Sequence, residues 1–205
     1  MVEVTLYGNK MTTCTQRILI LLEELNLKYN FKNIDLKKNE HKTEEFLQLQ
    51  PFGKVPAMTY GERKLFESRS ILRYIAKNNI EFEDFLGDTE VDVWLEAESQ
   101  NFNPLASKIV YEKVFKKMWN KESDEKVVEE CVKELEKVLD IYEKRLENVP
   151  YIAGESYSIA DISHIPYSNH LLRCGFKDLF KSRPNVYKWI KRIMKREAVE
   201  NVLRH

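Results

Sequence analysis

The stretch VEVTLYGNKMTTCTQRILILLEELNLKYNFKNIDL, residues 2–36, decides the fold of the N-terminal part of this chain. Its first residues alternate, with Val2, Val4 and Leu6 on one side of a strand that ends at Gly8. TQRILILLEELN then predicts a helix whose dense apolar run is buried on much of its surface, and KYNFKNIDL predicts a second strand. Because a strand, a buried helix and a second strand form a βαβ unit, we expect the two strands to be parallel.

The segments that follow complete a first domain. PAMTY and KLFES, on either side of the Gly61-Glu62 turn, predict a short antiparallel hairpin, and SRSILRYIAKN predicts a helix capped by a serine. The order β-α-β and then β-β-α predicts a thioredoxin-like α/β domain over residues 1–80. The polar stretch at 81–90 is interpreted as a linker, and residues 91–205 are predicted to form an all-α domain.

The helical part of the chain has three informative segments. VDVWLEAESQNFNPLASKIVYEKVFKKMW predicts one long helix, or two, with Pro104 disturbing the middle. SDEKVVEECVKELEKVLDIYEKRLEN is the clearest helix, with Ser123 as its predicted cap, and Cys131 on its apolar stripe is interpreted as a small core residue. In SYSIADISHIPYSNHLL, Ser158 and Asp161 form a variant of the capping box.

Composition limits the possible functions. The 205 residues include 33 basic and 33 acidic side chains, which argues against a nucleic-acid partner bound by bulk electrostatics. The three cysteines have no metal-ligand spacing, so neither a metal site nor a disulfide framework is expected. The chain shows no signal-peptide pattern and no run of about 18 apolar residues. We therefore expect a cytoplasmic protein with no membrane contact.

The turn YGNKMTTCTQRI places hydroxyls and one thiol at the start of the first helix. A hydroxyl there lies beside backbone N–H groups and the positive helix end, where it can stabilise a thiolate. Thr12, Thr13 and Thr15 all have the required chemistry, and the alternative is that they only cap the helix. The thiol is either that of Cys14 or that of a bound ligand.

The segment FGKVPAM offers a backbone site for an extended peptide. Pro56 cannot donate to a strand ladder and must lie at the beginning of its strand. If the Val55–Pro56 bond is cis, the Val55 N–H and C=O face outward and can pair with a peptide ligand. The alternative is an ordinary trans proline in a loop.

Two further segments carry charged groups at chain reversals. In LFESRSI, Glu67 and Ser68 stand where a strand meets a helix, so that helix N–H groups can bind a carboxylate and Glu67 can pair with an ammonium group. In EHK, His41 and Lys42 can hold a terminal carboxylate. The alternatives are a simple helix cap and a solvated charge cluster.

In this order, the strand–hydroxyl–helix unit, EHK, PFGKVPA and LFESRSI resemble a cytosolic glutathione transferase, and the resemblance covers essentially the whole chain. The second half contributes NFNPLASKIVYEKVFKKM, YIAGESYSIADISHIPYSNHLL and LFKSRPNVYKWIKRI. NEHK, LQPFGKVPA and VFKKM are most similar to the phi class. The resemblance implies a glutathione-binding domain followed by a helical electrophile-binding domain.

The resemblance also implies roles in glutathione binding. The catalytic position falls on Thr12, where a serine is usual in the family. Lys54 stands where a glutamine is common. Together the residues implied to bind glutathione are His41 and Lys42 at the glycyl carboxylate, Lys54, Val55 beside cis-Pro56 at the cysteinyl part, and Glu67 with Ser68 at the γ-glutamyl group. Asp161 is expected to be a structural cap and not catalytic.

For the second substrate, the resemblance implies a hydrophobic electrophile held by Met11, Phe115 and Trp119. Tyr111, Phe115 and Trp119 share a helical face, and the alternative is that these rings belong to the core. The implied protein is a homodimeric detoxification enzyme that uses glutathione as co-substrate without a permanently bound cofactor or metal. Reduction of organic hydroperoxides is an expected side activity.

Two alternatives remain at this point. One is a non-catalytic protein of the same fold that binds ligands or partners, which the threonine in place of serine at position 12 supports. The other is a thiol reductase in which Cys14 forms a mixed disulfide. Full reductase activity in a Cys14→Ser variant would exclude the second alternative.

Overall fold

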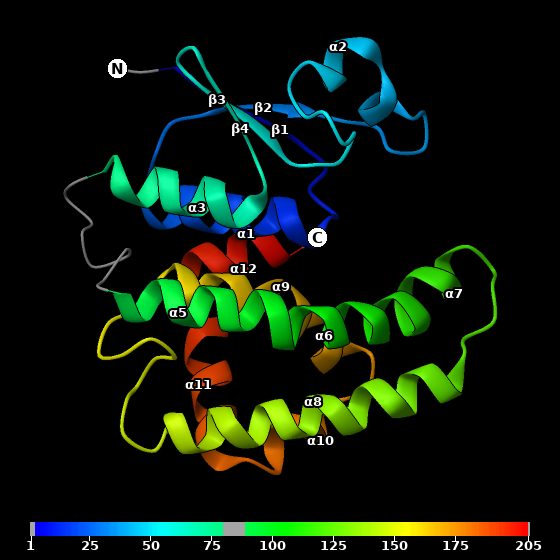
Figure 1. Ribbon diagram of the computed structural model, residues 1–205, viewed down its shortest axis with the longest axis vertical. Helices are drawn as coiled ribbons and strands as arrows, with labels where there is room; N and C mark the ends of the chain where they lie inside the picture. Colours follow the sequence, from blue (N-terminus) through cyan, green and yellow to red (C-terminus); the bar gives the residue numbers. More distant parts are fainter. Residues whose placement is uncertain (1–2, 80–88, 205) are drawn as a thin grey trace. The chain divides into compact units, whose positions relative to one another are not determined.

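The computed structural model describes residues 3–79 and 89–204 (Figure 1). Their contacts form two compact units. The first holds the described part of residues 1–83 together with residues 197–204, and the second holds the described part of residues 84–196. The predicted linker lies outside the described residues except for Thr89 and Glu90, which begin helix α5.

The first unit is built on a four-stranded sheet with the order β2-β1-β3-β4. Its strands are β1 (Val4–Gly8), β2 (Asn30–Asn33), β3 (Ala57–Tyr60) and β4 (Arg63–Phe66). β1 is parallel to β2, with Thr5 opposite Asn30, and antiparallel to β3, with Leu6 opposite Met58. β3 and β4 are antiparallel. The predicted parallel βαβ unit and the predicted hairpin are both confirmed.

Helices cover this sheet. The first unit contains α1 (Thr13–Glu24), the 3₁₀ turn η1 (Glu40–Lys42), α2 (Glu44–Leu47), α3 (Ser68–Lys77) and α12 (Glu197–Leu203). α1 contacts both α3 and α12, and Figure 1 shows α1 and α3 side by side on one face of the sheet. Every side chain from Ile18 to Leu22 is buried, as predicted. Because Ala198 and Val199 are buried too, α12 belongs to this unit, although the sequence interpretation assigned it to the helical domain.

The second unit is helical throughout its described residues. Its elements are α5 (Thr89–Ala97), the π-helical turn η3 (Glu98–Phe102), α6 (Asn103–Val110), the π-helical turn η4 (Tyr111–Phe115), α7 (Lys116–Met118), α8 (Glu125–Arg145), α9 (Ile159–Arg173), α10 (Lys177–Lys181) and α11 (Pro184–Met194). Pro104 lies in the first turn of α6, directly after η3. The regular α-helix is thus interrupted by a π turn just before Pro104, so the predicted disturbance of the long helix is confirmed.

Two predicted helix caps are wrong by one residue. α8 is capped by Asp124 and not by Ser123, because the Asp124 carboxylate accepts hydrogen bonds from the backbone N–H groups of Lys126 and Val127. The cap position of α3 is Glu67, and Ser68 is already helical. In both cases a good capping residue stands beside the true cap. The capping box at Ser158 and Asp161 of α9 is confirmed.

A ring of aromatic side chains fills the core of the second unit. Phe102, Tyr142 and His164 contact one another, and Trp189 contacts Tyr142 and His164. The Tyr142 hydroxyl lies 3.0 Å from Nε2 of His164. Nδ1 of His164 lies 2.7 Å from the carbonyl of Ala160, which can only accept, so Nδ1 carries a hydrogen. Burial, followed by the nearby Glu98, raises the pKa of Tyr142.

None of the helices formed by the described residues has the length and apolar character needed to cross a membrane.

Candidate active site

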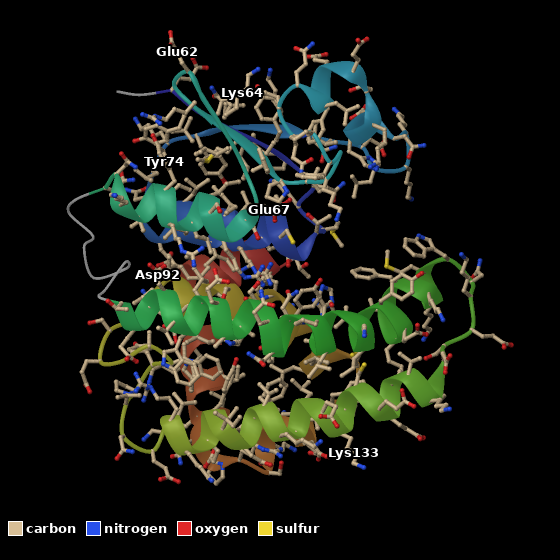
Figure 2. All side chains as sticks on the ribbon, in the orientation of Figure 1. Glu62, Lys64, Glu67, Tyr74, Asp92 and Lys133 are labelled. Carbon is tan, nitrogen blue, oxygen red and sulfur yellow. The ribbon has the colours of Figure 1, made fainter. Side chains whose placement is uncertain are left out.

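One end of the sheet in the first unit gathers the predicted site segments. β1 ends at Gly8, β4 ends at Phe66, and β3 begins at Ala57, which pairs with Phe66. The segments that follow β1 and β4 and the segment that precedes β3 therefore meet at the same end of the sheet. Figure 2 shows Glu67 at this end, where β4 passes into α3, and Glu62 at the hairpin turn beyond the opposite end.

Thr12 occupies the N-cap position of α1, but its side chain does not cap the helix. Its Oγ1 lies 2.9 Å from the carbonyl oxygen of Asn9 and 2.7 Å from Oγ1 of Thr15. The Asn9 carbonyl also accepts the Thr12 backbone N–H at 2.9 Å. The hydroxyl is therefore held beside the helix N-terminus, half-buried, with its oxygen fixed by two neighbours.

The partner hydroxyl, that of Thr15, is completely buried. Its Oγ1 accepts a hydrogen bond from the Asn9 backbone N–H at 3.3 Å. Gly8 allows this close approach, because a Cβ at position 8 would lie 2.7 Å from both Oγ1 and Cγ2 of Thr15. The first turn of α1 is thus packed directly against the end of β1.

Cys14 lies in the first turn of α1 and is half-buried. Nη1 of Arg17 lies 3.5 Å from the Cys14 Sγ and 3.4 Å from the Ser68 Oγ. The Arg17 side chain is completely buried, which is rare for a charged residue. Arg17 was missed from the sequence, although a cation at the start of a run of buried apolar residues was the available signal.

The N-terminus of α3 has no side-chain cap. Glu67 precedes it with φ 64° and ψ 112°, a conformation that non-glycine residues rarely adopt and that is found mainly at functional sites. The Glu67 side chain is exposed, whereas Ser68 is only 5% exposed. The open helix end and the neighbouring carboxylate can together receive a carboxylate and an ammonium group.

The Val55–Pro56 peptide bond is cis. Within the described residues, no hydrogen bond engages the Val55 amide or carbonyl. Lys54 is exposed, and its backbone N–H donates to Oε1 of Gln50 at 3.1 Å. The backbone of Val55 is thus available to a ligand in the way that the sequence interpretation required.

His41 and Lys42 form most of the 3₁₀ turn η1. The ammonium group of Lys42 donates to the Phe52 carbonyl at 3.3 Å, and Nδ1 of His41 is buried without a hydrogen-bond partner within the described residues. Gly53, with φ +58°, joins the two segments, because a Cβ there would lie 2.8 Å from the His41 carbonyl. The structure therefore places His41 and Lys42 beside the segment that leads to Val55.

The predicted electrophile residues lie in different units. Met11, in the first unit, is 56% exposed beside Thr12. In the second unit, Phe115 stacks on Trp119 with ring centroids 6.4 Å apart, and Trp119 is 57% exposed. Phe115 also meets His170 edge to face at 6.0 Å. Burial, followed by repulsion from Arg173, lowers the pKa of His170, so that this imidazole is neutral near pH 7.

Comparison with known proteins covers both halves of the chain. The family model described as "Glutathione S-transferase, N-terminal domain" matches residues 2–77, and "Glutathione S-transferase, C-terminal domain" matches residues 102–197. Glutathione S-transferase F7 of Arabidopsis thaliana is 40% identical over 99% of this chain and 100% of its own length. A glutathione S-transferase of Hyoscyamus muticus is 39% identical over 94% of each chain.

Solved structures give the same result. Glutathione transferase F7 from Populus trichocarpa superposes with a TM-score of 0.94 at 36% identity, over 98% of each chain. Glutathione S-transferase I from maize, in complex with an atrazine glutathione conjugate, has a TM-score of 0.91 at 33% identity, over 98% of this chain and 96% of that one. In each comparison the similarity extends over nearly the full length of both chains.

Proposed function

The chain belongs to the glutathione S-transferase family, within its phi class, and from this premise we propose that Thr12 is the residue that activates glutathione. The protein is an enzyme that uses glutathione as a co-substrate and conjugates it to electrophiles. In our proposal, the Thr12 hydroxyl donates a hydrogen bond to the glutathione sulfur. This bond and the positive end of α1 stabilise the thiolate, which then attacks the electrophile.

The observation that carries the proposal is the convergence of three binding elements at one end of the sheet. They are the hydroxyl of Thr12 at the start of α1, the unpaired backbone of Val55, and the uncapped start of α3. Glutathione is an extended tripeptide with a thiol in its middle and charged groups at both ends, so it needs all three. We assign its binding to His41, Lys42, Lys54, Val55, Pro56, Glu67 and Ser68.

Within this assignment, charge decides the orientation of glutathione. The exposed carboxylate of Glu67 pairs with the α-ammonium group of the γ-glutamyl part, whose carboxylate accepts from Ser68 and the N–H groups of α3. His41 and Lys42 attract the glycyl carboxylate at the other end. The cysteinyl part lies between them on Val55 and directs its sulfur toward Thr12.

We further propose that the electrophile is hydrophobic and that Phe115 and Trp119 of the second unit bind it. The exposed ring of Trp119, stacked on the half-buried ring of Phe115, supports this, because such a pair offers an aromatic face to a planar apolar ligand. Binding both substrates converts a bimolecular reaction into one between positioned groups.

The same glutathione thiolate can also attack an organic hydroperoxide. This step releases an alcohol and leaves a glutathione sulfenic acid, which a second glutathione converts to glutathione disulfide and water.

Cys14 is a competing candidate for the reactive thiol, and the guanidinium of Arg17 at 3.5 Å from its sulfur favours it. We expect Cys14→Ser to keep the thiolate absorbance that develops on glutathione binding and to keep kcat/KM within about twofold, because the ionised sulfur is that of the ligand. The measurement is the ultraviolet titration of the protein with and without glutathione. Loss of the glutathione-dependent absorbance, with glutathione still bound, would assign the chemistry to Cys14.

A homodimer is our proposal for the assembly, supported by exposed apolar side chains between β2 and β3. Phe52 is 64% exposed and Leu47 is 38% exposed, and the Phe52 ring meets Phe66 edge to face at 6.1 Å. Such an exposed anchor is typical of a protein interface.

We propose a cytoplasmic location because Cys14, Cys131 and Cys174 are free thiols, as expected in a reducing compartment.

The dimer proposal predicts that Phe52→Glu dissociates the protein. A charge at a buried anchor of an interface costs about 2 kcal/mol or more, so the dimer dissociation constant should rise by at least about 30-fold. Sedimentation velocity over a range of concentrations measures this change. Ile141→Glu is the control, because Ile141 is 60% exposed on α8 and should leave the association unchanged. A wild-type protein that sediments as a monomer would refute the proposal.

A further inference from the structure

We propose that Thr15 is a positioning residue, whose hydroxyl donates a hydrogen bond to the oxygen of Thr12 and so directs the hydrogen of Thr12 toward the glutathione thiolate. The inference rests on the proposed role of Thr12 and adds a second hydroxyl behind it. Thr15 itself does not touch glutathione in this arrangement.

The numbers of hydrogen-bond donors and acceptors on Thr12, Thr15 and Asn9 favour donation from Thr15 to Thr12. Two hydroxyl oxygens lie 2.7 Å apart, and each hydroxyl has one hydrogen to donate. Oγ1 of Thr15 already accepts the Asn9 N–H at 3.3 Å, and Oγ1 of Thr12 lies 2.9 Å from the Asn9 carbonyl. If Thr15 donates to Thr12, the hydrogen of Thr12 is directed to the Asn9 carbonyl, and every group is satisfied.

Glutathione binding then requires only a rotation of one hydrogen. The Asn9 carbonyl keeps its second donor, the Thr12 backbone N–H at 2.9 Å, so it is not left unsatisfied when the Thr12 hydroxyl turns away. The Thr12 oxygen stays in place and its hydrogen points to the sulfur. Because hydrogen bonds in a chain polarise one another, the bond received from Thr15 makes Thr12 a stronger donor to the thiolate.

The position of Thr15 is fixed by packing. It is completely buried in the first turn of α1, and the absence of a side chain at Gly8 lets it lie against the end of β1. A buried hydroxyl held on two sides has few alternative rotamers, and its β-branch restricts χ1 further. The buried hydroxyl of Thr15 therefore fixes the position of the half-buried hydroxyl of Thr12 at the ligand site.

Thr15→Val removes this hydroxyl while keeping the side-chain shape. We expect the pKa of the bound glutathione thiol to rise by about half to one unit, and kcat/KM at neutral pH to fall about 3- to 10-fold. KM for glutathione should stay within about twofold, because Thr15 does not contact the tripeptide. Thr15→Ser should restore the wild-type pKa. The measurement is the ultraviolet titration of the thiolate in the glutathione complex.

Thr13→Val is the matched control, since Thr13 is 5% exposed in the same helical turn and has no place in the pair of hydroxyls. An equal rise of the thiol pKa in Thr13→Val and Thr15→Val, or an unchanged pKa in Thr15→Val, would overturn the inference. The double variant Thr12→Ala/Thr15→Val should titrate like Thr12→Ala alone, because Thr15 acts only through Thr12.

The same set of variants separates this inference from the proposed function. If Thr12→Ala leaves the thiol pKa unchanged, the role of Thr12 fails and this inference fails with it. If Thr12→Ala raises the pKa and Thr15→Val does not, only the role of Thr15 fails. Glutathione affinity within about twofold of wild type confirms that each variant keeps a folded site.

Discussion

Replacing Thr12 with alanine is expected to return the thiol pKa of bound glutathione to that of the free tripeptide and to lower kcat/KM about 10²-fold. Loss of one donor to a developing or stabilised anion typically costs this much in an enzyme site. The positive end of α1 remains in the variant, but its N–H groups are directed by the helix and do not replace a hydroxyl at the sulfur. Thr12→Ser should keep at least half of the wild-type activity, since it supplies the same hydroxyl.

The experiment titrates the ultraviolet absorbance of the thiolate in the glutathione complex and follows conjugation of an aromatic electrophile in parallel. Thr13→Ala is the control, because it removes a neighbouring hydroxyl, whereas the Thr12 hydroxyl pairs with Asn9 and Thr15. Calorimetry of glutathione binding ensures that each complex is formed. Bound glutathione that stays ionised in Thr12→Ala would transfer the activating role to the helix N-terminus alone.

A threonine at position 12, where a serine is usual in the family, restricts the orientation of the hydroxyl group. The β-methyl restricts χ1, and the structure shows the rotamer that results: the hydroxyl oxygen lies between Asn9 and Thr15 instead of capping α1. A serine could rotate to the capping position. In this chain the oxygen is held in one place, so in our proposal activation depends on the direction of the Thr12 hydroxyl hydrogen.

Most of the fold of the first unit could be predicted from the sequence, because the hydrophobic pattern of each strand and helix lies within that segment alone. Alternation over Val4 and Leu6 and the dense run from Ile18 to Leu22 each specify an element without reference to distant residues. The place of α12 could not be predicted in this way. Its short sequence indicates a helix with an apolar face, but only the folded chain shows that this face covers α1.

The candidate site was predictable in its motifs and not in its hydrogen bonds. The residues around Thr12, Val55 and Glu67 stand next to turn and strand signals that place them at ends of elements. The burial of Arg17, the pairing of Thr12 with Thr15 and the open start of α3 depend on atoms brought together by the sheet. Sequence patterns define positions along the chain, whereas hydrogen bonds need the direction of each side chain.

Asp161→Ala is expected to have the largest effect on stability, about 3 to 5 kcal/mol of unfolding free energy. The Asp161 carboxylate is completely buried and accepts the backbone N–H of Ile152 at 3.0 Å and the indole N–H of Trp189 at 2.7 Å. It also accepts the backbone N–H of Ser158 at 2.9 Å and lies 3.2 Å from its hydroxyl. Removing it leaves three buried N–H groups without an acceptor and opens a space beside Trp189.

Urea unfolding, followed by tryptophan fluorescence, measures the loss. Asp178→Ala is the control: Asp178 is also an aspartate in the first turn of a helix, but its side chain is 91% exposed, so the change should stay below about 0.5 kcal/mol. Asp161 lies in the second unit, and we interpret it as a structural cap. The folded fraction of Asp161→Ala should therefore keep the wild-type thiol pKa of bound glutathione. A raised thiol pKa in that fraction would show that the cap of α9 also serves the catalytic hydroxyl, and would contradict its purely structural role.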